Sequence, residues 1–154
     1  MKIIEAKKKD INCIIKMNKE MADYHWKIDN YYKSGREIEF GFKKWILKNF
    51  GKRNFKILIA KEKNKILGYG IAEIKKPKPY IRPKKIGHLT NLYVKEKYRR
   101  HGIGRQIFDK FLEWFKSREI KHIELSVDSR NQIGISAYQK YGFFEYQKKM
   151  RMDL

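Results

Sequence analysis

The sequence has one cysteine, three prolines and no long apolar run. The lone Cys13 excludes an internal disulfide, and because it lies in an apolar helical pattern we interpret it as core filler rather than as a nucleophile. No stretch approaches the roughly 18 consecutive apolar residues of a membrane helix. The charged residues 1–5 lack the apolar segment of a signal peptide. We therefore expect a soluble, cytoplasmic protein with no membrane partner.

Acidic residues are also scarce, since 17 Asp and Glu stand against 38 Lys and Arg, a formal net charge of +21. Such an excess indicates either an acidic partner, such as nucleic acid or a phosphate-rich ligand, or a compositional bias that also enriches Ile and Asn. Eleven basic residues and one acid, Glu96, lie between positions 75 and 105. We expect part of this charge to attract a polyanionic cofactor and the rest to be solvated surface.

The apolar content is sufficient for one folded domain. Of 154 residues, 42% are hydrophobic and 14% aromatic, so we expect a single domain over residues 1–154 with its own core. Hydrophobic periodicity and turn residues give the order of elements. The predicted strands are 2–6, 55–60, 66–74, 86–94, 122–127 and 143–152, and the predicted helices are about 10–24, 36–49, 102–117 and 131–141.

A glycine-punctuated loop follows the strand at 86–94. Arg99-x-x-Gly102-x-Gly104 places two residues without Cβ where the chain turns into a helix. The free N–H groups and the positive dipole end of that helix suit an anion such as a pyrophosphate, and Arg100 and Arg105 add positive charge. The dinucleotide fingerprint and the P-loop signature are both absent. The alternative interpretation is an ordinary helix cap with solvated arginines.

Three segments in sequence order resemble the GNAT superfamily of acyl-CoA-dependent N-acetyltransferases. They are the string Asn91–Val94, the Arg99–Gly104 loop, and Asn131 followed by Tyr138-x-x-Tyr141-Gly142-Phe143. The resemblance is specific over roughly residues 86–144 and rests on strand order alone before that.

This resemblance implies a mixed α/β (α+β) GNAT fold. The central sheet should be mostly antiparallel, splayed between the strands near 86–94 and 122–127, and flanked by about four helices. It further implies that the first of these strands carries a bulge, that backbone groups of Leu92 and Val94 bond pantetheine, and that an amide near Leu92 polarises the thioester carbonyl.

Acetyl-CoA is the co-substrate that the resemblance implies. No metal is expected, because the four histidines and the lone cysteine show no ligand spacing. Asn131 is equally well explained as an ordinary helix N-cap. The residues carried over as cofactor-binding are Leu92, Tyr93, Val94, Arg99, Arg100, His101, Gly102, Ile103, Gly104, Arg105 and Asn131.

Two residues are candidates for proton transfer. Tyr138 matches the family position of a phenol that protonates the leaving thiolate, although a half-buried aromatic on an amphipathic helix would look the same. Many relatives carry a glutamate base where this chain has Thr90, so we assign the base to His88, two residues earlier on the same strand. Glu73 and Asp128 are rivals, and His88 is otherwise an ordinary surface or core histidine.

By the same resemblance, the first two helices and their connection form one wall of the acceptor site. We expect Asp23 and Asp29 to hold an ammonium there, beside aromatics that either contact the acceptor or simply pack. These aromatics are Tyr24, His25, Trp26, Tyr31 and Tyr32.

The resulting hypothesis is an N-acetyltransferase that moves an acetyl group from acetyl-CoA to a primary amine of a small molecule, peptide or protein, by direct attack in a ternary complex. A homodimer is compatible with the resemblance. The less favoured alternative is a basic GNAT-fold module that binds RNA, DNA or a ribosome with little or no catalysis, which Thr90 and the lysine excess support. The acceptor and the length of the acyl group are left open.

Overall fold

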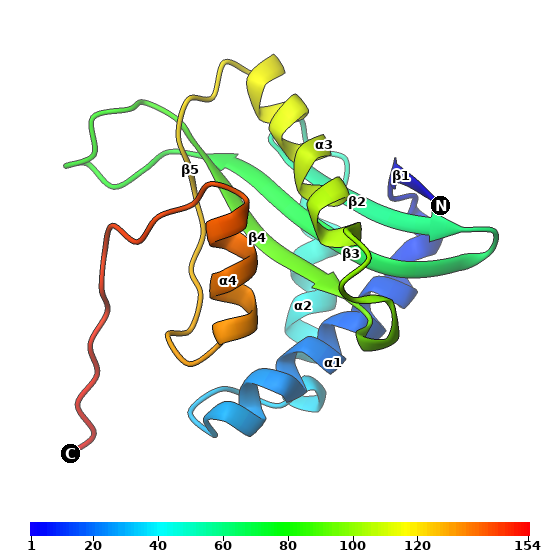
Figure 1. Cartoon of the computed structure of the whole chain (residues 1–154), viewed down its shortest axis with the longest axis horizontal. Coiled ribbons are helices and arrows are strands. Elements are labelled where there is room, and N and C mark those ends of the chain that lie inside the picture. Colours follow the sequence, from blue (N-terminus) through cyan, green and yellow to red (C-terminus); the bar gives the residue numbers. More distant parts are fainter.

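Five strands form one sheet in the order β1-β2-β3-β4-β5 (Figure 1). In this computed structural model, which describes residues 1–154, four strands are antiparallel to their neighbours and the fifth runs parallel to β4. This is the mixed α/β fold, with a mostly antiparallel sheet, that the sequence predicted. The strands are β1 (Lys2–Glu5), β2 (Phe55–Glu62), β3 (Lys65–Lys75), β4 (Ile86–Val94) and β5 (Ile123–Glu124), and the helices are α1 (Ile11–Ile28), α2 (Gly35–Asn49), α3 (Ile103–Ser117) and α4 (Gln132–Lys140).

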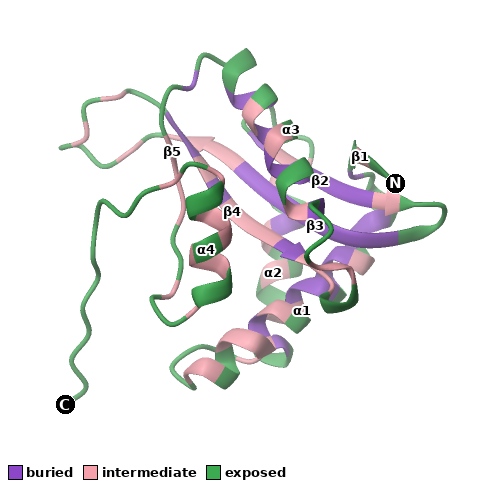
Figure 2. Cartoon of the chain, viewed as in Figure 1, coloured by how far each residue is buried: buried purple, intermediate pink, exposed green.

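The sheet separates two hydrophobic cores (Figure 2). On one face, α1 and α2 bury Ile14, Met17 and Ile46 against the strands. On the other face, α3 buries Phe111 and Phe115. Each such side chain, fully withdrawn from water, contributes about 1.5–3 kcal/mol, so the sheet is held from both sides.

Local signals explain where the helices begin. Ser34 and Glu37 form a capping box at the start of α2, with the Ser34 N–H donating to Glu37 Oε2 at 2.9 Å. Gly102 precedes α3 in a left-handed conformation, φ +72°. None of the helices is long and apolar enough to span a membrane.

Two predicted strands differ from the structure. The strand expected at 122–127 is reduced to Ile123–Glu124, because β5 pairs with β4 only opposite Gly87 and His88 and the chains then diverge. This divergence is the splay implied by the resemblance.

The strand expected at 143–152 does not form, and the prediction was wrong there. Its apolar side chains alternate as a strand requires, but the segment forms no backbone ladder and extends away from the sheet toward the C-terminus (Figure 1). Phe144 and Met150 remain 81% and 97% exposed. Single side-chain contacts hold the segment, namely Tyr146 to Glu124 and Arg151 to Asp29.

Candidate functional site

A bulge in β4 sets the direction of the residues that follow it. The register between β3 and β4 shifts so that Thr90 has no partner on β3. Before the bulge, Leu89 faces the core beneath α3, and after it Leu92 and Val94 face the same side. Tyr93 faces the opposite core, beneath α1. The extra residue therefore changes which side chains face α3, from odd-numbered residues before the bulge to even-numbered residues after it.

The same reversal aims backbone groups at the opening between β4 and β5. The Lys95 N–H donates to Leu67 O on β3 at 2.9 Å, so by alternation the backbone groups of Leu92 and Val94 point away from β3. Because β5 has already left the ladder, these groups line a wedge between the two strands. The Val94 carbonyl accepts a hydrogen bond from Arg99 Nε at 2.9 Å.

Tyr93 does not face this wedge. Its side chain lies under α1, where its hydroxyl donates to Glu20 Oε2 at 2.7 Å. Alternation directs its backbone groups toward β3. The structure therefore separates Tyr93 from Leu92 and Val94, with which the sequence grouped it.

The glycine loop lies at the far end of β4 and opens α3. Arg100 and Gly102 both have positive φ, +64° and +72°, and the first backbone bond of α3 runs from Gln106 N–H to Gly102 O at 3.0 Å. The N–H groups of residues 103–105 consequently have no partner within the helix. Arg100 and His101 are exposed on this loop, so the local charge and the helix dipole both favour an anion.

The Arg105 side chain makes contacts within the protein. Its Nε donates to Asp109 at 2.8 Å, and the guanidinium lies 5.6 Å from the centre of the Tyr141 ring. The side chain thus links α3 to α4, and only its backbone N–H faces the loop.

Tyr141 joins the loop to the wedge, a role that the residue pattern did not predict. A Cβ atom on Gly104 would lie 2.9 Å from the Tyr141 hydroxyl, 3.8 Å from Val94 Cγ2 and 4.0 Å from Leu92 Cδ2. The Tyr141 ring is stacked on Phe108 with centroids 5.2 Å apart. The only sequence signal was an aromatic residue within the Tyr138–Phe143 string.

Tyr138 lies on the same side of the sheet, on α4. It packs against the core beneath α3, and burial, followed by the neighbouring Tyr141, raises its pKa to about 12. Its hydroxyl makes no hydrogen bond within the chain, yet no buried side-chain polar atom lacks a partner. The hydroxyl therefore reaches an accessible space while keeping its proton at neutral pH.

Asn131 caps α4. Its Oδ1 accepts the Gly134 N–H at 3.0 Å and lies 3.4 Å from the Tyr24 hydroxyl. The N-cap interpretation is therefore sufficient to explain this residue, and it also connects α4 to the end of α1.

His88 lies on β4 just before the bulge, in a small polar cluster. Its Nδ1 is 3.4 Å from Glu73 Oε1 and 3.3 Å from Thr90 Oγ1. Burial, and then the charge of Lys75, lower the pKa of His88 below its usual 6.5, while Glu73 and Glu124 act in the opposite direction. The imidazole is consequently neutral at physiological pH, the form that accepts a proton.

Of the two rivals for the base, Asp128 does not suit the role. Hydrogen bonds from Arg130, and then from Tyr32, hold the pKa of its carboxyl far below the usual range. Such a carboxylate is too weak a base near neutral pH. Glu73 remains beside His88 as its partner.

The connection between α1 and α2 is tied to the loop before α4. The Tyr32 hydroxyl donates to Asp128 at 2.7 Å, and Asp29 accepts from both Arg130 and Arg151 at 3.0 Å. Asp23 accepts the Gly35 N–H at 2.7 Å. Asp23 and Asp29, expected to hold an ammonium, are instead occupied by the chain's own donors.

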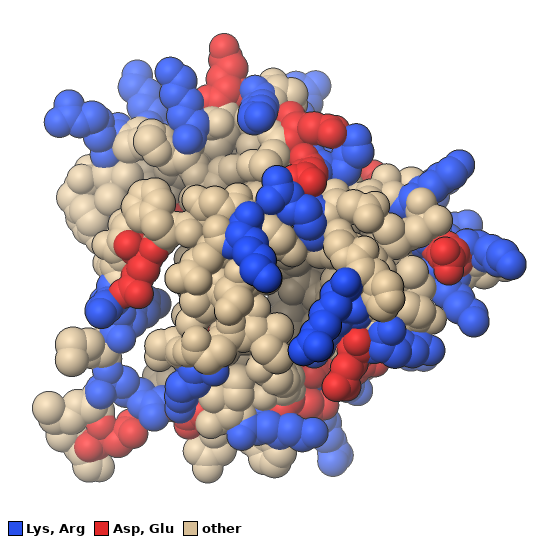
Figure 3. Space-filling model, viewed as in Figure 1, with Lys and Arg blue, Asp and Glu red and all other residues tan.

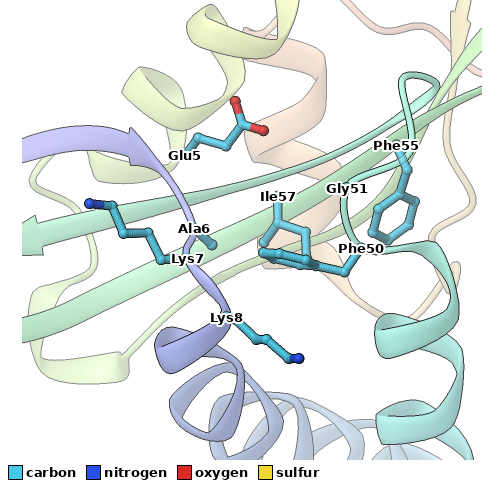
Figure 4. Close-up of a pocket in the computed structure, with 8 residues that line it drawn as sticks. All are labelled: Glu5, Ala6, Lys7, Lys8, Phe50, Gly51, Phe55 and Ile57. Carbon is cyan, nitrogen blue, oxygen red and sulfur yellow. The ribbon is translucent and has the colours of Figure 1, made fainter.

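A separate hollow of about 450 Å³ lies near the other edge of the sheet, between β1, β2 and the end of α2 (Figure 4). It is lined by Lys7, Lys8, Phe50 and Phe55, among others. None of the predicted site residues borders it.

The structure also holds no group of three His, Cys, Asp or Glu side chains arranged to bind a metal ion.

A model of the Acetyltransferase (GNAT) family matches residues 18–143. The chain belongs to this family. The match includes the bulged strand, the glycine loop and α4, the three parts that meet around Gly104. Predicting GNAT membership from these segments was therefore correct.

Solved structures share the GNAT fold over nearly the whole chain. A tetramutant of the BH1408 protein from Bacillus halodurans is 23% identical with a TM-score of 0.86, covering 100% of both chains. A predicted acetyltransferase with acetyl-CoA from Clostridium acetobutylicum is 22% identical, with a TM-score of 0.79 over 99% of this chain and 95% of that one. The aminoglycoside antibiotic 6′-N-acetyltransferase AAC(6′)-IG from Acinetobacter haemolyticus is 16% identical, with a TM-score of 0.78 over 100% and 98%.

Proposed function

We propose that this GNAT chain transfers an acetyl group from acetyl-CoA to a primary amine. The observation that carries the proposal is the meeting of the wedge and the glycine loop at Gly104, where free backbone groups of β4 lie beside the free N–H groups of α3. That combination suits a ligand with an amide-containing arm and a diphosphate. The neighbour from Clostridium acetobutylicum, whose structure contains acetyl-CoA, supports this assignment.

In the proposed complex, the N–H groups of residues 103–105 hold the diphosphate. The pantetheine arm follows the open edge of β4, bonding Leu92 and Val94. The Leu92 N–H donates to the thioester carbonyl oxygen and stabilises the negative charge that develops there as the amine attacks. Val94 offers mainly its N–H, because its carbonyl is already bonded to Arg99.

The acid and the base act from opposite faces of the sheet. His88 lies beside Glu73, and Gly87, the preceding residue, faces Phe115 beneath α3, so the His88 side chain points to the α1 and α2 face. Tyr138 is on the α3 side. The amine nitrogen forms a bond to the carbonyl carbon and passes a proton to His88. The carbon–sulfur bond then breaks, and the Tyr138 hydroxyl donates a proton to the leaving sulfur. The products are the acetylated amine and free CoA thiol.

We infer that the acceptor is an amine that also carries an anionic group, such as an amino acid or an acidic peptide. Tyr31 and Tyr32, on the connection between α1 and α2, lie beside two half-exposed arginines, Arg130 on the loop before α4 and Arg151 on the C-terminal segment. Asp29 and Asp128 are already paired with these arginines and are not free to hold ammonium groups. The net charge of +21 also disfavours a polycation such as an aminoglycoside.

Calorimetric titration with acetyl-CoA, at low and at high salt and against ATP, tests the cofactor. We expect saturable one-site binding of acetyl-CoA that persists at high salt and is not displaced by ATP. Binding of acetyl-CoA no tighter than that of ATP would remove the catalytic proposal and leave the non-catalytic alternative. The acceptor screen then compares acidic dipeptides with spermidine and an aminoglycoside, and faster acetylation of the polycations would contradict the inferred acceptor class.

A further inference from the structure

A second cationic surface lies away from the candidate site, on the connection between β3 and β4. Residues 76–85, here called the basic arm, contain no acidic residue and three prolines, Pro77, Pro79 and Pro83. The arm folds back on itself at a turn formed by Pro79 and Tyr80, where the Ile81 N–H donates to Lys78 O at 2.9 Å. The five basic residues of the arm are all exposed: Lys76, Lys78, Arg82, Lys84 and Lys85.

The arm and the glycine loop are at opposite ends of β4 (Figure 1). The nine residues of β4 separate them by about 30 Å, at a rise of about 3.3 Å per residue. The basic residues between positions 75 and 105 therefore form two clusters, one at each end of β4, and not a single group around one anion site. Only the cluster after β4 is close enough to contact the phosphates of a bound cofactor.

The charge of the arm is not neutralised within the chain. None of its five cations forms an ion pair, whereas the neighbouring Lys75 is paired with Glu124 at 3.3 Å. Lys and Arg side chains project from the upper left of the molecule in Figure 3, the side on which the arm lies in Figure 1. Five unpaired cations on one exposed loop form a site for a polyanion, since each contact can release a counterion from it.

Exposed aromatic side chains accompany these cations. Tyr80, within the arm, is 70% exposed, with Lys78 Nζ 5.8 Å from its ring centre. Phe144 and Tyr146, on the segment after α4, are 81% and 59% exposed. The Tyr146 hydroxyl donates to Glu124, the partner of Lys75 at the base of the arm, so the two segments lie next to each other.

We propose that the basic arm, together with Tyr80 and Tyr146, binds single-stranded nucleic acid. Exposed aromatic rings stack on unpaired bases while cations follow the backbone, the combination used by proteins that bind single strands. No helix projects from this surface to enter the groove of a duplex. An anionic membrane is less suitable, because the arm has no apolar helical face to insert between lipids.

The proposal is tested by the anisotropy of labelled 12-nucleotide oligouridylate and oligothymidylate, titrated with the full chain over a range of salt. With about five phosphates contacted, we expect log Kd to rise with log salt with a slope of about 3.5. Replacing all five arm cations by Gln should weaken binding more than tenfold and reduce the slope to near 0. Tyr80→Ala should weaken binding about fivefold or more without changing the slope, because stacking releases no counterions. Comparison of the two oligonucleotides shows whether RNA or DNA is preferred.

A matched control separates the arm from the general charge of the molecule. Lys9, Lys16, Lys43, Lys44 and Lys48 are exposed and form no ion pairs, and replacing these five by Gln changes the net charge by the same amount. We expect this variant to bind within twofold of the unmodified chain. Equal weakening in the two variants would overturn the proposal, as would arm-dependent binding to phosphatidylserine vesicles with none to oligonucleotides. Circular dichroism confirms that both variants are folded.

Discussion

The hydroxyl oxygen of Tyr141 lies 2.9 Å from the position that a Cβ atom on Gly104 would occupy. Gly104 belongs to the start of α3 and Tyr141 to the end of α4, so this contact joins the two helices over the end of β4. The Tyr141 ring cannot easily move aside, because it is stacked on Phe108 and covered by Arg105. The Tyr141 hydroxyl can therefore occupy this position over the loop only because Gly104 has no side chain.

Gly104→Ala is therefore expected to weaken acetyl-CoA binding about tenfold or more. The new methyl group would displace the Tyr141 hydroxyl and narrow the junction of loop and wedge, which calorimetry detects as a higher Kd. Gly104→Ala combined with Tyr141→Phe should recover much of the affinity, since the hydroxyl is the atom that clashes. Failure of this rescue would show that Gly104 acts in another way.

Gly41→Ala is the matched control for that substitution. Gly41 lies on the exposed side of α2, with nothing within 4 Å of the position that the new methyl group would occupy. The replacement should leave acetyl-CoA binding unchanged and raise the free energy of unfolding by about 0.5–1 kcal/mol, because alanine favours the helix over glycine. Urea unfolding followed by circular dichroism measures this change.

Tyr138→Phe should lower kcat about 100-fold with little change in the KM for acetyl-CoA, because it removes the proposed proton donor to sulfur and keeps the ring. Stability should be nearly unchanged, since the hydroxyl makes no hydrogen bond in the chain. Steady-state kinetics at saturating acceptor provide the measurement. A fall in acetyl-CoA affinity with unchanged kcat would assign Tyr138 to binding instead.

The pKa of His88 should respond in opposite directions to its two neighbours. Glu73 raises this pKa and Lys75 lowers it, so Glu73→Gln should move it further below 6.5 and Lys75→Gln should move it upward. In the proposed mechanism the neutral imidazole is the base. The acidic limb of the kcat profile should therefore shift to lower pH in the first variant and to higher pH in the second.

NMR titration of the His88 ring protons, assigned with His88→Gln, measures these shifts directly. If the ring titrates as expected while the kcat profile does not follow it, His88 is a structural histidine. A His88→Gln variant with full activity across neutral pH leads to the same conclusion.

Asn18→Ala should destabilise the chain by about 2–4 kcal/mol, because removing the acceptor leaves two donors without a partner next to the β4 bulge. Asn18 is 3% exposed, and its Oδ1 accepts from Tyr69 Oη at 3.0 Å and Asn91 Nδ2 at 3.3 Å. Tyr69→Phe, which removes only one donor, should cost about 1 kcal/mol, and equal losses in the two variants would contradict this account. Urea unfolding measures both.

Much of the fold was predictable because its signals are local. The capping box at Ser34 and Glu37, the alternation along β4 and the glycines at 102 and 104 each act within a few residues of chain. The four helices and the first four strands accordingly form where the periodicity predicts them, and the family was identified from the same segments.

Other features depend on contacts between distant segments, which periodicity does not encode. The pattern of residues 143–152 predicts a strand, but a strand forms only where a partner edge is in register, and β5 leaves the ladder after Glu124. The hydrogen bonding of Asp29 likewise depends on distant residues, because its carboxylate accepts from Arg130 and Arg151, both more than 100 residues away. The sequence by itself determined the four helices, the first four strands, the glycine loop and the family of this protein. Only the tertiary structure decided that Thr90 is the bulge and that Tyr141 covers Gly104, because both depend on strand pairing and packing between distant parts of the chain.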